Sequence, residues 1–319
     1  MKKAISKWLS ILIPLALGIG LIVYQYNSFT SQQLDEIKSY FKNANYFYVF
    51  LSLVVATFGF ISRAYRWKFS IEQMGYHSKF QNNLMAVCAC YFMNLSVPRS
   101  GEISRALILK KYEDVPFDKA FGTIIAERVV DSILFFIFIV AAFVMQFDIL
   151  KEFILETIPI KKLIFILVIG FILFITFILI WLYSNFKIIK KLKKKFEGLI
   201  EGMTSIIKMK NKWAFLFHSL FIWFSYILMF YLAIFALKET SSISFGAVII
   251  GFVIGTLAIG FTNSGFGAFP VLVAQIFMLY GISNTAGTAF GWIVWTSQTA
   301  LTLLLGGLSF LLLPVLNRK

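Results

Sequence analysis

Long apolar segments dominate this sequence and restrict the folds that it can adopt. A helix needs about 20 apolar residues to cross the hydrocarbon core of a bilayer. Strands of a membrane barrel would alternate apolar and polar residues instead. The sequence therefore predicts an all-α polytopic membrane protein with a single integral membrane domain over residues 1–319. The nine apolar segments span residues 8–26, 46–66, 83–97, 120–146, 162–184, 213–236, 243–262, 264–280 and 287–313.

The composition agrees with this class and excludes two others. Hydrophobic residues make up 59% of the chain and charged residues 14%, whereas soluble domains are about 25% charged. A disordered chain would be poor in aromatic residues, and this one has 37 Phe, 13 Tyr and 7 Trp. The formal net charge is +15. In a membrane protein we expect that surplus to mark cytoplasmic loops and to meet lipid headgroups, not nucleic acid.

The charges between the apolar segments predict the orientation. Residues 185–212 carry nine Lys and two Glu, whereas residues 147–160 carry three acidic residues and one Lys. The positive-inside rule places the first loop in the cytoplasm and the second outside. Lysines before the first segment, and Arg318 and Lys319 after the last, place both termini in the cytoplasm. The first segment is long for a signal peptide and no Ala-x-Ala site follows it, so we expect an uncleaved span in a bacterial inner membrane.

One short segment does not fit a simple crossing. Residues 67–82 and 105–119 both carry positive charge and are predicted to be cytoplasmic, and only segment 83–97 lies between them. We therefore expect a re-entrant hairpin that turns at residues 98–101 and returns as a half-helix from about Glu102, with about eight other segments crossing fully. Non-helical backbone is tolerated at membrane depth only where it lines a cavity or packs against protein. This turn is therefore a candidate site.

A second interruption lies at residues 262–270, which contain Gly265, Gly267 and Pro270. The two interruptions look alike, since residues 92–96 read Phe-Met-Asn-Leu-Ser and residues 261–264 read Phe-Thr-Asn-Ser. Interrupted helices in corresponding halves indicate a transporter built on an inverted repeat, here with halves of about 1–160 and 161–319. Two unrelated kinks remain the alternative, because Gly and Pro are frequent in membrane helices.

Three charged groups fall in or beside apolar segments, although a charge at a helix centre costs about 2.5–3.5 kcal/mol. Three structural alternatives stay open: interfacial arginines, a solvated loop and an ion pair that closes the bundle. We expect Glu102 to pair with Arg99 or Arg105, and Arg128 to pair with Asp131. If the groups converge, they form a net positive site suited to a lipid phosphate. The groups are Arg63 with Arg66; Arg99, Glu102 and Arg105; and Glu127, Arg128 and Asp131.

The stretch from Asn94 to Arg105 reads Asn-Leu-Ser-Val-Pro-Arg-Ser-Gly-Glu-Ile-Ser-Arg. It resembles the Asn-x-x-x-Pro-x-x-Gly-Glu-x-x-Arg signature of the lysylphosphatidylglycerol synthase transmembrane-region family. The Glu127-Arg128-x-x-Asp131 and Arg66-Trp67 motifs are similar to that family too. The family includes the flippase half of the multiple peptide resistance factor. The resemblance implies a polytopic bundle that moves phospholipids between leaflets.

The chain departs from the family pattern in two places. The family usually carries Pro-Gly-Gly-x-Gly-x-x-Glu in the later interruption. Here Gly265 and Gly267 are kept, but Pro270 replaces the acid, which puts carboxylate-dependent coupling or recognition of a cationic headgroup in doubt. The sequence stops at Lys319, just after the last apolar segment, so we expect no aminoacyl-transfer domain and no lysyl-lipid synthase activity in this chain.

These observations predict an inner-membrane lipid transporter, a flippase or scramblase-like protein, and not an enzyme. The alternatives are a membrane enzyme acting on lipid or polyprenyl phosphates and an accessory subunit. We expect no catalytic set, cofactor or metal, because His77 and His218 are isolated and Cys88 and Cys90 read as packing residues. The expected partners are membrane phospholipids and, as an open alternative, further copies of the chain. The predicted substrate-binding residues are Asn94, Arg99, Glu102, Arg105, Glu127, Arg128, Asp131, Arg66, Asn263, Gly265 and Gly267.

Overall fold

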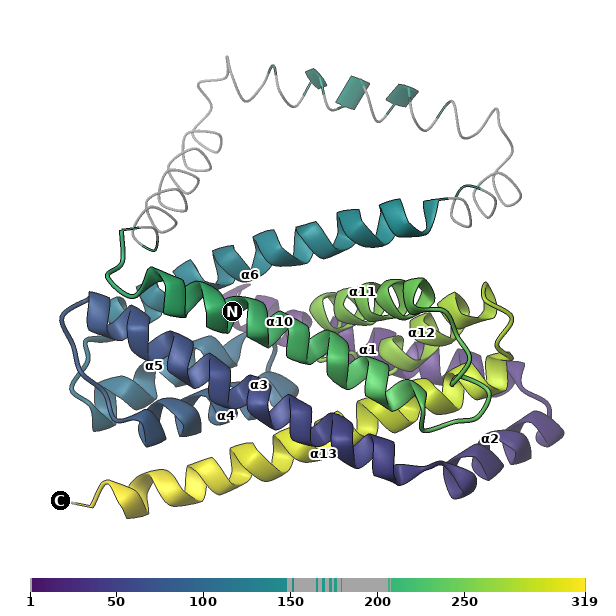
Figure 1. The fold of residues 1–319 in the computed structure, drawn as a ribbon, viewed down its shortest axis with the longest axis horizontal. Coiled ribbons are helices and arrows are strands. Elements are labelled where there is room, and N and C mark those ends of the chain that lie inside the picture. The colour runs from purple at the N-terminus through teal and green to yellow at the C-terminus, as the bar shows by residue number, and fades with distance from the viewer. Residues whose placement is uncertain are drawn as a thin grey trace.

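The computed structural model describes residues 2–147 and 208–318, with single positions between 151 and 206. All regular structure in these residues is helical, which confirms the predicted all-α class (Figure 1). Most of the apolar segment 162–184, of loop 147–160 and of loop 185–212 lies outside the described residues. The helices are α1 (Lys2–Ser28), α2 (Ser31–Asn43), α3 (Tyr46–Gln73), α4 (Phe80–Ser96), α5 (Ser100–Tyr112), α6 (Phe117–Met145), α10 (Lys212–Ile234), α11 (Phe245–Phe261), α12 (Ala268–Met278) and α13 (Asn284–Leu316).

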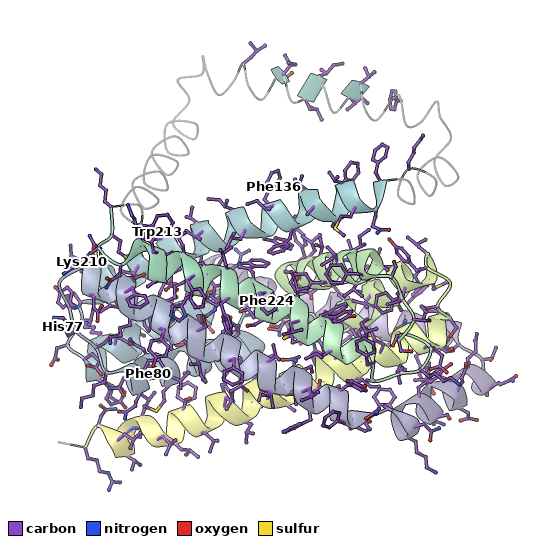
Figure 2. All side chains as sticks on the ribbon, viewed as in Figure 1. His77, Phe80, Phe136, Lys210, Trp213 and Phe224 are labelled. Carbon is purple, nitrogen blue, oxygen red and sulfur yellow. The ribbon has the colours of Figure 1, made fainter. Side chains whose placement is uncertain are left out.

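Four of the described helices are long and apolar enough to cross a bilayer. They are α3 with 28 residues, α6 with 29, α10 with 23 and α13 with 33. At 1.5 Å per residue, each reaches about 34 Å or more, against a hydrocarbon core of about 30 Å. Large apolar side chains cover the outside of the bundle, such as Phe136 on α6 and Phe224 on α10, which are 64% and 59% exposed (Figure 2). This surface is that of a multi-pass membrane protein.

Helices α4 and α5 form the predicted hairpin. Arg99, at the turn, has a left-handed backbone with φ of 62°, and α5 begins directly after it at Ser100. The side-chain carbonyl of Asn94 accepts a hydrogen bond of 2.7 Å from the backbone N–H of Gly101. A Cβ on Gly101 would lie 2.0 Å from the carbonyl oxygen of Cys90. Glycine is therefore required where the two helices approach each other most closely.

Helices α11 and α12 form a second hairpin, which differs from the expectation that both segments cross. Helix α12 has 11 residues, so it extends only about 16 Å and is too short to span the hydrocarbon core. The turn before it contains three residues with positive φ, namely Ser264, Gly265 and Gly267. That backbone cannot continue a right-handed helix, so the apolar segments end there although their composition does not change.

The two hairpins start from opposite ends of the bundle, and their turns meet inside it. At one end Asn82 of α4 exchanges two side-chain hydrogen bonds with Asn317, after the last turn of α13. At the other end the Tyr280 hydroxyl, after α12, donates to the Gln146 side chain, after α6. Figure 1 shows α4 and α5 on the left and α11 and α12 on the right, with α13 running along both.

Each half of the chain contains a long helix, a hairpin and another long helix. The first set is α3, α4–α5 and α6, and the second is α10, α11–α12 and α13. Helices α3 and α10 are antiparallel, since the Asn45 N–H donates to the Ala236 carbonyl while Ser62 contacts His218. This order and these opposite directions agree with an inverted repeat, which stays a prediction together with its proposed boundaries.

The interiors of the two halves differ in chemistry. The second half is filled by aromatic side chains around Phe230, which packs edge-on against Phe252, Phe269, Phe277 and Phe290. The first half buries aliphatic residues and Trp67 beside a set of charged side chains. Cys88 and Cys90 are buried and unpaired among these packing residues, as predicted. The candidate site therefore belongs to the first half.

Candidate functional site

Charged side chains from three helices converge beside the first hairpin. The arginines of α3 are buried, with Arg63 3% and Arg66 0% exposed, so the alternative in which they reach the interface is wrong. The convergence of the three charged groups is confirmed, apart from Arg99. The resulting ion network has a formal charge of +1, from four arginines and three carboxylates. Its members are Arg63, Arg66, Glu102, Arg105, Glu127, Arg128 and Asp131.

Asp131 of α6 is the centre of the network. Arg66 binds it in a bidentate manner, with Nη1 2.6 Å from Oδ1 and Nη2 3.0 Å from Oδ2. Arg63 donates from Nη1 to Oδ2 at 3.1 Å and from Nη2 to the Tyr226 hydroxyl at 3.0 Å. The Tyr226 hydroxyl is 2.8 Å from that of Tyr91. These charge-assisted bonds fix both α3 arginines in one geometry.

Glu127 holds a second fully buried pair. Arg105 of α5 donates from Nη1 to Glu127 Oε2 at 2.9 Å, and Arg66 Nη2 lies 3.7 Å from the same oxygen. The Arg105 guanidinium also lies over the Trp67 ring, 3.7 Å from its centroid. The Trp67 ring is held in turn by a hydrogen bond of 2.9 Å from its Nε1 to Thr123 Oγ1. Arg105 is thus held between a carboxylate and an aromatic face.

The third pair is the outer one. Arg128 Nη2 donates to Glu102 Oε1 at 3.0 Å, and the two side chains are 39% and 21% exposed. The expectation that Glu102 pairs with Arg99 or Arg105 is wrong, because α5 packs against α6, where Glu102 meets Arg128 and Arg105 meets Glu127. The predicted approach of Arg128 to Asp131 is found, with Nη1 3.7 Å from Oδ2.

Arg99 stands apart from the network. It is exposed at the hairpin turn, and it makes no ion pair with any residue that the structure describes. Glu102, three residues later, points instead to α6. Arg99 therefore offers a cation, three residues before Glu102, that no described carboxylate neutralises.

The remaining predicted residues lie where the two hairpins meet. Asn263 donates from Nδ2 to the Leu95 carbonyl at 3.1 Å, and Asn94 bonds to Gly101 within the first hairpin. Gly265 and Gly267 have φ of 80° and 70°, and a Cβ on Gly267 would lie 2.2 Å from the Gly18 carbonyl oxygen of α1. These residues shape the junction, and none of them contacts the ion network in the described hydrogen bonds.

Three neighbours of the network were not predicted, namely Tyr91, Tyr226 and Ser219. The Ser219 hydroxyl accepts a hydrogen bond of 3.2 Å from Arg66 Nη1. For Ser219 and Tyr226, the sequence offered one signal, namely that polar residues occur inside the apolar segment 213–236. His218 lies 2.8 Å, through Nδ1, from Ser62 Oγ on α3. His77 is exposed beyond the end of α3 (Figure 2).

The network has unused hydrogen-bonding capacity, mostly on the donor side. Four buried guanidinium nitrogens lack a hydrogen-bond partner among the described residues: Arg63 Nε, Arg66 Nε, Arg105 Nε and Arg105 Nη2. Two buried carboxylate oxygens also lack one, Glu102 Oε2 and Glu127 Oε1. Among the described residues, no group of three His, Cys, Asp or Glu could hold a metal ion. Positive charge and surplus donors suit an oxyanion.

Comparisons with known proteins show the family of this chain. The profile of the lysylphosphatidylglycerol synthase TM region matches residues 11–306, a range that contains both hairpins and the ion network. The UPF0104 membrane protein MJ1595 of Methanocaldococcus jannaschii is 35% identical over 108 residues, which are 33% of this chain and 32% of that protein. The match thus spans about a third of the relative's length. No solved structure matches. The chain belongs to the lysylphosphatidylglycerol synthase transmembrane-region family.

Proposed function

We propose that this protein moves phospholipids between the leaflets of a bacterial inner membrane, as a flippase or a scramblase-like transporter and not as an enzyme. The observation that carries the proposal is the meeting of two hairpin turns inside the bundle, beside a net positive ion network. Membership of a family linked to phospholipid handling supports it. The membrane phospholipid is thus the expected partner.

The physical argument starts from the barrier to lipid exchange. A headgroup that crosses the hydrocarbon core loses its hydration, and burying a charge or an unpaired polar group is costly. Non-helical backbone at membrane depth supplies hydrogen-bonding groups there, and transporters use interrupted helices in this way. Ionisable residues inside a membrane bundle are costly to keep and mark substrate pathways by default.

The charge of the site favours a phosphate-bearing headgroup. Arginine binds phosphate through parallel N–H donors, and the network holds one more arginine than it has carboxylates. The second turn, residues 262–267, contains no charged residue, so it offers no carboxylate to a cationic headgroup. The sequence contains no P-loop motif, so we propose passive or ion-coupled movement.

The orientation is part of the same proposal. Lys110 and Lys111 lie in the last turn of α5. Lys210 precedes α10, Lys212 begins it, and Arg318 follows α13. These basic residues lie at the end of the bundle from which the first hairpin starts. Positive residues concentrate on the cytoplasmic side, so we propose that this end, with both termini, faces the cytoplasm.

The test is leaflet exchange in proteoliposomes. Phosphatidylglycerol with a fluorescent acyl chain is reconstituted with the purified protein, and dithionite measures the fraction that reaches the outer leaflet. We expect exchange above protein-free vesicles, and little exchange of a fluorescent glucosylceramide, which lacks phosphate. Arg99→Ala with Arg128→Ala should reduce the rate at least about tenfold, since two charge-assisted contacts are lost.

The matched control removes two exposed lysines of α2, Lys38→Ala with Lys42→Ala, which leaves the network untouched. This control should exchange lipid at the wild-type rate. Equal rates for the arginine double variant and the wild type would remove the site from the proposal. No exchange by the folded wild type would reject the proposed function.

A further inference from the structure

We propose that Arg128 is the residue that binds the lipid phosphate and that Glu102 is the carboxylate which the phosphate displaces. The inference rests on the proposed function and names the binding residue within it. It separates the network into three arginines that hold the fold together and one that exchanges its partner.

The three inner arginines are committed to other side chains. Arg66 uses both Nη atoms on Asp131. Arg105 is held between Glu127 and the Trp67 ring. Arg63 bridges Asp131 and Tyr226. All three are buried. Their nitrogens without a described partner, such as Arg105 Nη2, are themselves buried, so a phosphate could reach them only by entering the packed interior and losing its hydration, which is costly.

Arg128 differs from them in exposure and in coordination. Its side chain is 39% exposed, so a headgroup can reach it without opening the bundle. It makes one short contact, from Nη2 to Glu102 Oε1 at 3.0 Å, while Nη1 lies 3.7 Å from Asp131. That second distance is too long for a hydrogen bond. Arg128 therefore has one guanidinium nitrogen free for a bidentate ligand.

Glu102 is the partner that can be replaced at least cost. It binds Arg128 through one oxygen, and its Oε2 has no hydrogen-bond partner in the part of the chain that the structure describes. Its side chain is 21% exposed, so solvent can reach it when the pair opens. The phosphodiester of a lipid headgroup has two charged non-bridging oxygens and can accept from both Arg128 nitrogens, whereas the present pair uses one.

Arg99 supplies a second cation in the same hairpin as Glu102. It lies three residues before Glu102, at the exposed turn that begins α5. It makes no ion pair with the described residues, so its charge is available to an anion that replaces Glu102. The outer pair with Arg99 carries two positive charges and one negative charge, and a bound phosphodiester neutralises the set.

Removing the Glu102 carboxylate should affect anion binding more directly than the same change would in an ordinary basic patch. In an ordinary basic patch, removing a neighbouring carboxylate affects anion binding only through long-range repulsion. Here Glu102 occupies the binding residue itself, so Glu102→Gln should tighten phosphate binding about 3-fold to 10-fold, because a neutral amide competes less well for Arg128. Arg128→Ala should weaken binding about tenfold or more.

The experiment measures binding and not transport. Full-length protein in a neutral detergent is titrated with a short-chain fluorescent phosphatidylglycerol, and affinity is read from fluorescence anisotropy. Inorganic phosphate and glycerol phosphate serve as competitors. Arg128→Lys keeps the charge but not the planar pair of donors, and should fall between the wild type and Arg128→Ala. Lys110→Ala, which removes an exposed charge from the same hairpin, should bind as the wild type does.

Each outcome decides the proposal. Tighter binding by Glu102→Gln together with weaker binding by Arg128→Ala supports it. Unchanged or weaker binding by Glu102→Gln, or unchanged binding by a folded Arg128→Ala, overturns it. If inorganic phosphate displaces the fluorescent lipid at concentrations equal to those at which the lipid itself binds, the site is one for free phosphate. That result overturns the headgroup assignment. If the variants bind lipid as expected but the wild type shows no leaflet exchange, the transport function is rejected and the binding site is still supported.

Discussion

The hydroxyl of Ser264, in the second hairpin, donates a hydrogen bond of 3.1 Å to the backbone carbonyl of Asn94 in the first. The neighbouring Asn263 side chain bonds to the Leu95 carbonyl in the same way. The Trp295 indole N–H, from α13, donates to the Ser264 carbonyl at 2.9 Å. The interior junction of the bundle is thus built from short polar side chains of the second turn and from carbonyls in the last turn of α4, which the end of the helix leaves without an intrahelical partner.

Gly101→Ala should prevent close packing of α4 and α5. The new Cβ would lie 2.0 Å from the Cys90 carbonyl oxygen, which is backbone and cannot move aside. We expect a loss of about 3 kcal/mol of stability, seen as aggregation in size-exclusion chromatography and a lower Tm in detergent. Gly122→Ala on α6 is the control, because nothing lies within 4 Å of its Cβ position. An equal Tm for the two variants would contradict the hairpin geometry.

Gly267→Ala tests the contact between the second turn and α1. Gly267 has φ of 70°, and its Cβ would lie 2.2 Å from the Gly18 carbonyl oxygen. Gly281 has a similar φ of 80° but nothing within 4 Å. Gly281→Ala should therefore cost only backbone strain of about 1 kcal/mol, and Gly267→Ala clearly more. The comparison by thermal unfolding in detergent separates strain from the close approach, and equal losses would mean that α1 does not press on this turn.

Arg66→Ala and Arg128→Ala should differ sharply in stability. The first leaves the buried Asp131 without its bidentate partner, which costs about 3–5 kcal/mol for a buried pair. The second breaks a half-exposed pair, for which about 1 kcal/mol is typical. Thermal unfolding of both variants in one detergent measures the difference. A larger loss for Arg128→Ala would show that the outer pair, not Asp131, holds α3, α5 and α6 together.

Cysteine labelling tests the orientation. Glu239→Cys and Lys210→Cys place a thiol at exposed positions at opposite ends of α10, while the native Cys88 and Cys90 are buried. In intact cells a membrane-impermeant maleimide should label the variant at position 239 and label the variant at position 210 only after lysis. The reverse pattern would place the basic end outside.

Length and charge were enough to predict the class of fold and the first hairpin. Both signals are local: residues 67–82 and 105–119 carry the same sign of charge, and one short segment separates them. The half-helix begins at Ser100, two residues before the predicted start, because the break is a single left-handed residue, Arg99. The amino-acid composition does not indicate a turn made by a single left-handed residue.

The second hairpin could not be predicted as such. Segments 243–262 and 264–280 are as apolar as true spans, and the sequence shows their interruption but not its backbone. Three positive φ values near Gly265 end α11 and delay α12 to Ala268. Hydropathy does not record backbone angles, so two crossings and one hairpin give the same profile.

The ion partners were predicted only in part. Spacing along α5 suggested pairs within that helix, yet Arg105 binds Glu127 and Glu102 binds Arg128, both on α6. Packing of α5 on α6 overrides the i,i+3 relationship because a buried charge takes the partner that is buried with it. The contact between Tyr226 and Arg63 could not be predicted, because the two residues are 163 positions apart in the sequence.

The bond between Asn94 and Ser264 joins residues 170 apart, and this separation bears on how the protein is made. At about 5–20 residues per second, the ribosome needs roughly 10–30 s to reach the second turn after it has finished the first. During that interval the Asn94 and Leu95 carbonyls lack the partners that the finished bundle gives them. The first half of the molecule therefore enters the bilayer as an incomplete product, and its assembly waits for the last third of the chain.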